Sequence, residues 1–175
     1  MHPIIPQMIG LFAVVTFLLS YQQKKRIGII IFNTVSRCLY ILQYVLLGAY
    51  SGAVLDILGA ISSIIATKKD SKFIKKHLKL VITVINGAIV ILGLIVYRTP
   101  LDLLPIAGVL LHTTAFWIDD EKIIRRVSLT GSPFWFVYNL LSRAYFSAAC
   151  DIFTIVSIVV AMIRYRKDGK KDINI

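Results

Sequence analysis

The sequence predicts an all-α membrane protein in which seven transmembrane helices form two parallel triple-helix repeats joined by one linker helix. Three observations support this fold class: an apolar composition, an alternation of apolar segments with short basic loops, and an internal repeat. Hydrophobic residues make up 57% of the 175-residue chain, and the mean hydropathy is +0.77. A soluble domain of about 150 residues buries only about 70% of its surface, so the remaining apolar surface is expected to face lipid.

Seven apolar segments follow one another along the chain. They occupy residues 4–20, 27–47, 53–67, 80–97, 103–117, 127–143 and 144–163. Several are shorter than the roughly 20 residues that an α-helix needs to cross a bilayer. We therefore expect seven spans whose boundaries can shift by a turn.

The basic residues predict the orientation of these spans. Seventeen of the 20 Lys and Arg residues lie in the loops after the first, third and fifth segments or in the C-terminal tail. Because basic residues near span ends are retained on the cytoplasmic side, the N-terminus is predicted outside and the tail inside. The longest basic stretch, from Lys68 to Lys79, is expected to lie on anionic lipid headgroups. The basic residues form no continuous stripe, which argues against nucleic-acid binding.

An internal repeat predicts the architecture. The stretch AYSGAVLDILGAISSIIA (49–66) returns 95 residues later as AYFSAACDIFTIVSIVVA (144–161), and seven of the 18 aligned positions are identical, including Tyr50/Tyr145 and Asp56/Asp151. We interpret this as a duplication. The predicted units are a first triple-helix repeat over 1–67, a basic loop and linker helix over 68–99, a second repeat over 100–167, and a tail over 168–175. Parallel repeats of this kind are a known transporter plan.

Three short motifs carry a family resemblance. The stretches PLDLLPIAG (100–108), LLGAY (46–50) and IRYR (163–166) resemble the YgjV-type bacterial inner-membrane proteins. The resemblance implies a location in the bacterial cytoplasmic membrane and no catalytic residues. The layout is similar to that of SWEET, PQ-loop and PnuC-like transporters. In the sugar transporters of that plan, paired polar residues on the third helix of each repeat line the pocket, which implies such a place for Asp56 and Asp151.

Two basic side chains are expected near the middle of the membrane. Arg37 lies ten residues beyond Ile27, which is about 15 Å along a helix, and a charge at that depth costs at least about 2.5 kcal/mol. It must face the bundle interior or a wet cavity, although a structural arginine on backbone carbonyls is the alternative. His112 reaches a similar depth and could instead be a packing residue. Together these two residues would suit a carboxylate or another anionic group of a small polar solute.

Further polar and aromatic residues follow helical spacing. On the second segment they are Asn33, Arg37, Tyr40 and Tyr44; on the sixth, Trp135, Tyr138 and Asn139 follow a proline that is expected to kink the helix. Helix packing is the alternative for the second group. For Asp56 and Asp151 the alternative is a favourable contact with the positive end of a helix dipole, worth 0.3–1 kcal/mol. The candidate solute-binding residues are Asn33, Arg37, Tyr40, Tyr44, Asp56, His112, Trp135, Asn139 and Asp151.

Two function classes remain after the motifs are considered. The sequence contains no metalloprotease, nucleophile or phosphate-loop motif, and Cys38 and Cys150 have no metal or redox spacing, so no enzyme activity, cofactor or metal is expected. The first class is a small-solute transporter with a site between the two repeats. The second is a scaffold or partner subunit whose polar residues only lock helices together. A water-accessible cavity reaching Arg37 would favour the first, and a dry bundle with Arg37 fully paired would favour the second.

Overall fold

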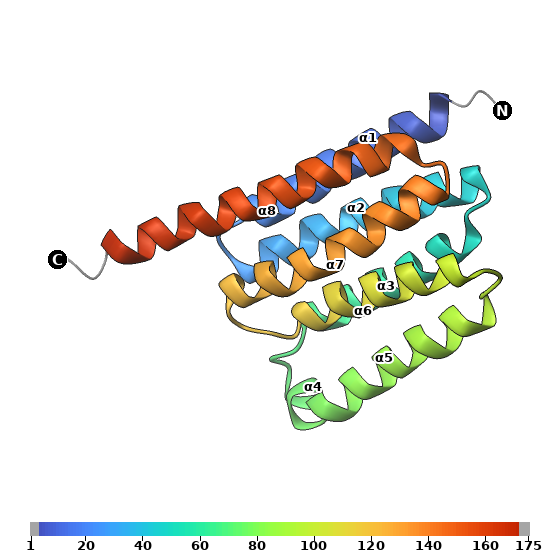
Figure 1. Cartoon of the computed structure of the whole chain (residues 1–175). Helices are drawn as coiled ribbons and strands as arrows, with labels where there is room; N and C mark the ends of the chain where they lie inside the picture. Colours follow the sequence, from blue (N-terminus) through green and yellow to red (C-terminus); the bar gives the residue numbers. More distant parts are fainter. Residues whose placement is uncertain (1–3, 172–175) are drawn as a thin grey trace.

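The protein is a helical bundle in which consecutive long helices run antiparallel, whereas the packed pairs α1/α8 and α3/α6 run in the same direction (Figure 1). The computed structural model describes residues 4–171, with side chains for residues 4–145 and 147–164, and these residues contain no strand. The elements are α1 (Ile4–Gln22), α2 (Arg26–Leu47), α3 (Tyr50–Thr67), α4 (Lys72–Lys76), α5 (Leu78–Ile95), the 3-10 helix η1 (Pro100–Asp102), α6 (Leu103–Ala115), α7 (Glu121–Leu141) and α8 (Tyr145–Lys171).

Five helices are long and apolar enough to cross a membrane. They are α1, α2, α3, α5 and, within α8, the segment Ser147–Arg164, and the segment Pro100–Ala115 is a shorter apolar helix. The remaining long helix, α7, begins with the charged sequence EKIIRR, which lowers its mean hydropathy. The prediction of an all-helical membrane protein is therefore confirmed.

The long helices pack in a fixed order around the bundle. In the first half, α2 lies between α1 and α3, and in the second half α7 lies between α6 and α8. The two halves meet where α1 packs on α8 and where α3 packs on α6. Helix α5 covers the outer side of α3 and α6 (Figure 1) and buries only Ile89 and Gly93. The loops that follow α1, α3 and α6 lie at the same end of the bundle as the C-terminal end of α8.

The largest differences from the predicted helix boundaries are in α3, α7 and α8. Helix α3 begins at Tyr50, before the expected start at Ala53. Helix α7 begins at Glu121, before the expected start at Val127, because the Asp120 side chain accepts hydrogen bonds from two orphan N–H groups of its first turn. Helix α8 continues through the predicted start of the tail, to Lys171. Helix α7 also runs unbroken through Pro133.

Two apolar clusters surround a buried polar layer. One cluster contains Phe17, Ile30 and Phe116, near the end with the basic loops, and the other contains Tyr40, Tyr44, Val109 and Trp135. On α2 the polar residues Asn33 and Arg37 lie between Ile30 and Tyr40, so the polar layer separates the clusters. This layer is where the candidate site residues gather.

Basic side chains join the two halves at the end of the bundle that holds α4. Arg26 donates to the carbonyls of Phe116 at 2.6 Å and Ala66 at 2.8 Å. Arg125 donates to the carbonyls of Tyr21 at 3.3 Å and Gln23 at 2.8 Å. These carbonyls lie at or next to helix C-termini, where they have no partner within the helix. Arg26 thus links the start of α2 to the ends of α3 and α6, and Arg125 links the start of α7 to the end of α1.

Candidate solute-binding site

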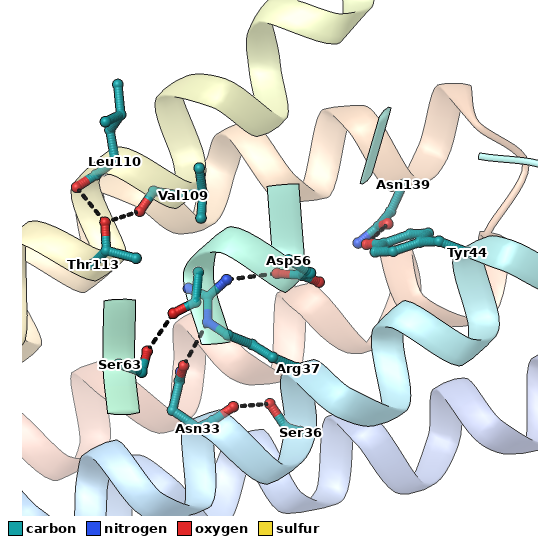
Figure 2. Close-up of polar contacts among 11 residues, drawn as sticks. Asn33, Ser36, Arg37, Tyr44, Asp56, Ser63, Val109, Leu110, Thr113 and Asn139 are labelled. Carbon is teal, nitrogen blue, oxygen red and sulfur yellow. Dashed lines mark hydrogen bonds and ion pairs between the residues drawn. The ribbon is translucent and has the colours of Figure 1, made fainter. Parts of the chain in front are cut away.

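A buried ion pair joins α2 to α3 inside the polar layer. Arg37 Nη1 lies 2.5 Å from Asp56 Oδ1, and Arg37 Nε donates to Asn33 Oδ1 at 3.0 Å. Arg37 and Asp56 are each 3% exposed. Figure 2 shows the guanidinium reaching from α2 across to α3, over the backbone near Ser63. Gly59 makes room for it, because a Cβ there would lie 2.8 Å from Arg37 Cζ.

A second polar chain joins α2, α7 and α8. Tyr44 Oη donates to Asn139 Oδ1 at 2.7 Å, and Asn139 Nδ2 donates to Asp151 Oδ2 at 2.8 Å. Figure 2 shows the Tyr44 and Asn139 side chains meeting between their helices. All three residues are buried. Among the described residues Asp151 forms no ion pair.

A small cavity lies between these two polar groups. Its volume is about 30 Å³, which is room for one or two water molecules and far below the 300–1,000 Å³ of typical small-molecule sites. The lining residues come from α1, α2, α3, α6, α7 and α8; they are Phe17, Ser36, Arg37, Tyr40, Tyr44, Asp56, His112, Ser132, Trp135, Asn139, Asp151 and Thr154.

Eight of the nine predicted site residues line this cavity. The exception is Asn33, which lies behind Arg37 and orients its guanidinium. Sequence reasoning missed Phe17, Ser36, Ser132 and Thr154. Ser132 could have been found from the repeat, since it lies 95 residues beyond Arg37, at the aligned position.

Aromatic rings form one side of the cavity. The rings of Tyr40 and Tyr44 are stacked with centroids 6.0 Å apart, and those of Tyr44 and Trp135 are stacked with centroids 6.1 Å apart. Tyr138 meets the rings of Tyr44 and Trp135 edge-on. Trp135 is 8% exposed, so it is an interior residue and not an interfacial anchor. Aromatic faces and carboxylates therefore share one small space.

His112 has a partner of its own. Its Nε2 lies 2.9 Å from the carbonyl oxygen of Ser128, and because a carbonyl only accepts, Nε2 must carry the hydrogen. A Cβ at Gly131 would lie 2.7 Å from His112 Cδ2, so the glycine lets α6 and α7 approach. Arg37 is paired with Asp56, so the carboxylate that it meets in this structure is a side chain of the protein.

The helix-dipole explanation for the two aspartates is also wrong. Helix α3 starts at Tyr50 and α8 at Tyr145, so neither Asp56 nor Asp151 lies in a first turn. The dipole's effect falls off within the first turn. The contacts of Asp56 and Asp151 are instead with Arg37 and Asn139.

A larger hollow opens at the opposite end of the bundle from α4. It has a volume of about 510 Å³ and is lined by the α2–α3 turn, the α5–α6 connection and Tyr138. Tyr138 Oη lies 3.0 Å from the Gly52 N–H and 2.9 Å from Ser51 Oγ, and Ser51 donates to Asp102 at 2.5 Å. Tyr138 therefore lies between this hollow and the aromatic wall of the cavity.

The structure and its polar interior define a polytopic helical membrane protein. Within the described residues no group of three or more His, Cys, Asp and Glu side chains could hold a metal ion. The sequence model of the Imp-YgjV family, described as a bacterial inner membrane protein, matches residues 4–169. The chain therefore belongs to this family, and its location is the bacterial inner membrane. No curated protein and no solved structure matches the chain significantly.

Proposed function

We propose that the protein crosses the inner membrane seven times and transports a small solute through the cavity between two triple-helix units. The first triplet is α1–α3, the second triplet is α6–α8, and α5 links them so that both point the same way. The N-terminus would lie outside and the C-terminal end of α8 inside. The polar residues that line the cavity carry the proposal, because so many polar groups at membrane depth are costly unless they meet water, a ligand or one another.

The packing order supports the two triplets. The contact of α1 with α2 has its counterpart in α6 with α7, and the contact of α2 with α3 has its counterpart in α7 with α8. The contacts between triplets also match, because the contact of α1 with α8 has its counterpart in the contact of α6 with α3. A rotation that exchanges the triplets would account for all of these pairs, with α5 outside the symmetry.

The ends of α2 and α7 support the same relation. Gly48 and Arg143 lie 95 residues apart, and both have left-handed backbones, with φ of 72° and 61°. The next residue closes each helix in the same way: Ala49 N–H donates to the Tyr44 carbonyl and Ala144 N–H to the Asn139 carbonyl, each at 2.9 Å. The two stretches share a helix-ending motif although their sequences differ.

Side-chain contacts between the triplets follow the same offset. Tyr44 and Asn139, which hydrogen-bond to each other, lie 95 residues apart. A residue that meets its own counterpart must lie close to the axis that relates the two copies. The cavity is next to this contact, which is the expected place for a site shared by both triplets.

In the proposed transporter the small cavity would belong to a closed conformation. A solute larger than one or two waters can enter only if the triplets move apart. The hollow near Ser51 and Asp102 gives a route from one face, and the hydrogen bonds of Tyr138 block it. Alternating access would require breaking these contacts on one side while the arginine contacts at the opposite end remain.

A scaffold is the second candidate function, and the Arg37–Asp56 pair favours it. Both side chains are buried and satisfied, as they would be if they only locked α2 to α3. A lock needs no cavity, however, and it accounts for neither Asp151 nor the aromatic wall. The two functions differ in whether any solute binds.

The test is a thermal-unfolding screen of the purified protein against a metabolite panel. A transporter should show a rise in Tm with at least one class of solute, and Trp135→Ala should abolish that rise. The matched control is Ser62→Ala, which changes a buried side chain of α3 that does not line the cavity. If no solute raises Tm and Arg37→Ala only lowers it, the protein is a scaffold.

A further inference from the structure

The charges that line the cavity do not balance. Arg37 is the one arginine or lysine among the lining residues, and it is matched by Asp56 at 2.5 Å. The second carboxylate, Asp151, has a neutral partner in Asn139. With a neutral His112 and both aspartates ionised, the lining would carry one net negative charge.

His112 does not supply the missing cation. Its Nε2–H donates to the Ser128 carbonyl, a bond for which the ring needs no positive charge. Its ring also lies against Phe17, with centroids 5.8 Å apart. Charging this ring would place a second cation beside Arg37 in a site from which water is largely excluded, which is costly.

The aromatic residues that line the cavity are suited to binding a cation. Tyr40, Tyr44 and Trp135 are stacked side by side and line the same cavity as Asp151. The face of an aromatic ring attracts a cation within about 6 Å, and the attraction grows when both are desolvated. A carboxylate beside such faces is a common arrangement for binding an ammonium group.

We propose that the cavity binds a compact cationic group of the solute, a protonated or quaternary amine, with Asp151 as its counter-ion and Tyr40, Tyr44 and Trp135 as its aromatic wall. The proposal rests on the proposed transport function and gives it a substrate class opposite in charge to the anion that the sequence suggested. The cavity has room for one or two waters, which is enough for a primary ammonium head, whereas a quaternary head requires the triplets to move apart. When no solute is bound, a proton on Asp151 takes the place of the cation.

Competition with protons follows from this arrangement. The other titratable or charged groups that face Asp151 across the cavity are Arg37, Tyr40 and Tyr44 of α2, Asp56 of α3 and His112 of α6. A cation that replaces a proton on Asp151 binds more weakly as pH falls, by up to about tenfold per pH unit once Asp151 is protonated in the free protein.

Choline, methylammonium and 3,3-dimethyl-1-butanol are suitable probes. The last is a neutral molecule with the shape of choline, so it separates charge from fit. Choline or methylammonium should raise the Tm of the purified protein in nanodiscs, and the neutral analogue should not. Asp151→Asn should abolish the shift, Trp135→Phe should weaken apparent affinity about three- to tenfold, and Ser62→Ala should leave it unchanged. Lowering the pH should weaken binding to the wild type.

Three results would overturn the inference. Equal stabilisation by the neutral analogue would show that the cavity binds a solute but has no preference for a cation. Stabilisation by both amines that persists in Asp151→Asn would place the cation elsewhere. No stabilisation by either amine up to 100 mM would exclude the amine head, while the wider metabolite panel decides separately whether any solute binds. If Asp151→Asn does not fold, which its unfolding curve without ligand shows, Trp135→Phe and the pH dependence decide.

Discussion

The two proposed triplets differ in the partners of their equivalent aspartates. In the first triplet α2 and α3 are joined by the Arg37–Asp56 ion pair, whereas in the second the position of Arg37 is taken by Ser132 and Asp151 accepts from Asn139. Asp56 and Asp151 lie at equivalent positions of the sequence repeat but have a charged and a neutral partner, respectively. One carboxylate is neutralised within its own triplet, and the other is left to the cavity. In the proposed transporter the two triplets would share one frame and divide structural and binding roles between them.

The largest expected effect is in cysteine labelling, which tests whether the two triplets run parallel. Its result is all or none. Single cysteines at Ser51, in the α2–α3 turn, and at Ser142, in the α7–α8 connection, should react with an impermeant reagent added to the periplasmic side. A cysteine at Lys72 should not. The background must lack Cys38 and Cys150. Labelling of Ser142 and Ser51 from opposite sides would mean that the triplets are inverted and the comparison fails.

Removing one partner of the ion pair should cost more than removing the unpaired carboxylate. Arg37→Ala leaves Asp56 as an uncompensated buried charge, a loss of about 3–5 kcal/mol in folding stability. Asp151→Asn removes a charge that has no ion-pair partner, so its effect should be below about 1 kcal/mol. Unfolding of both variants in the same detergent measures the difference. Equal losses would show that the two aspartates have equivalent surroundings.

Glycine at the crossing of α2 and α3 should be required in the first triplet only. Gly59→Ala places a Cβ against the Arg37 guanidinium and Val109, and overpacking of this kind costs about 1–3 kcal/mol. The matched control is Thr154→Ala at the equivalent position of α8, which removes a local hydrogen bond to the Cys150 carbonyl and should cost less than about 1 kcal/mol. A larger loss of stability for Thr154→Ala than for Gly59→Ala would contradict the close contact of the Arg37 side chain with α3.

The shared helix ending predicts changes of opposite sign. Arg143→Gly relieves a left-handed backbone at a residue with a side chain and should stabilise the protein by about 1 kcal/mol. Gly48→Ala imposes the same strain on α2 and should destabilise it by a similar amount. The two variants are compared by their shifts in Tm. Stabilisation by both would show that the αL conformation is not maintained at Gly48.

The smallest effect is expected in the basic loop after α3. Lys69 pairs with Asp119 and donates to the Trp117 carbonyl at 3.0 Å, and its hydrogen bond lowers the pKa of Asp119. The resulting stability is present above the ordinary carboxylate pKa and is lost as pH falls through the lowered value. Because Asp119 is largely exposed, its ion pair with Lys69 contributes less than about 1 kcal/mol to folding stability. Asp119→Asn should flatten the stability profile only in that acid range.

Much of the site was predictable because depth along an apolar helix follows from residue counting. Arg37, His112 and Trp135 were placed in the interior on the cost of exposing polar groups to lipid, and the cavity includes all three. The partners were not predictable. Counting gives depth but not the rotation of one helix against the next, so it could not choose Asp56 over His112 as the neighbour of Arg37.

The sequence by itself determined the membrane class, the number of long helices and the residues that had to avoid lipid. These follow from transfer free energies and from helical rise, which depend on the chain locally. Only the tertiary structure decided which buried charges meet. Pairing depends on a close approach of α2 and α3 that a missing Cβ at Gly59 permits, and on the contact of Tyr44 with Asn139 across the bundle. Among the described residues Asp151 is consequently left without an ion-pair partner, since the cavity lining has one arginine for two aspartates.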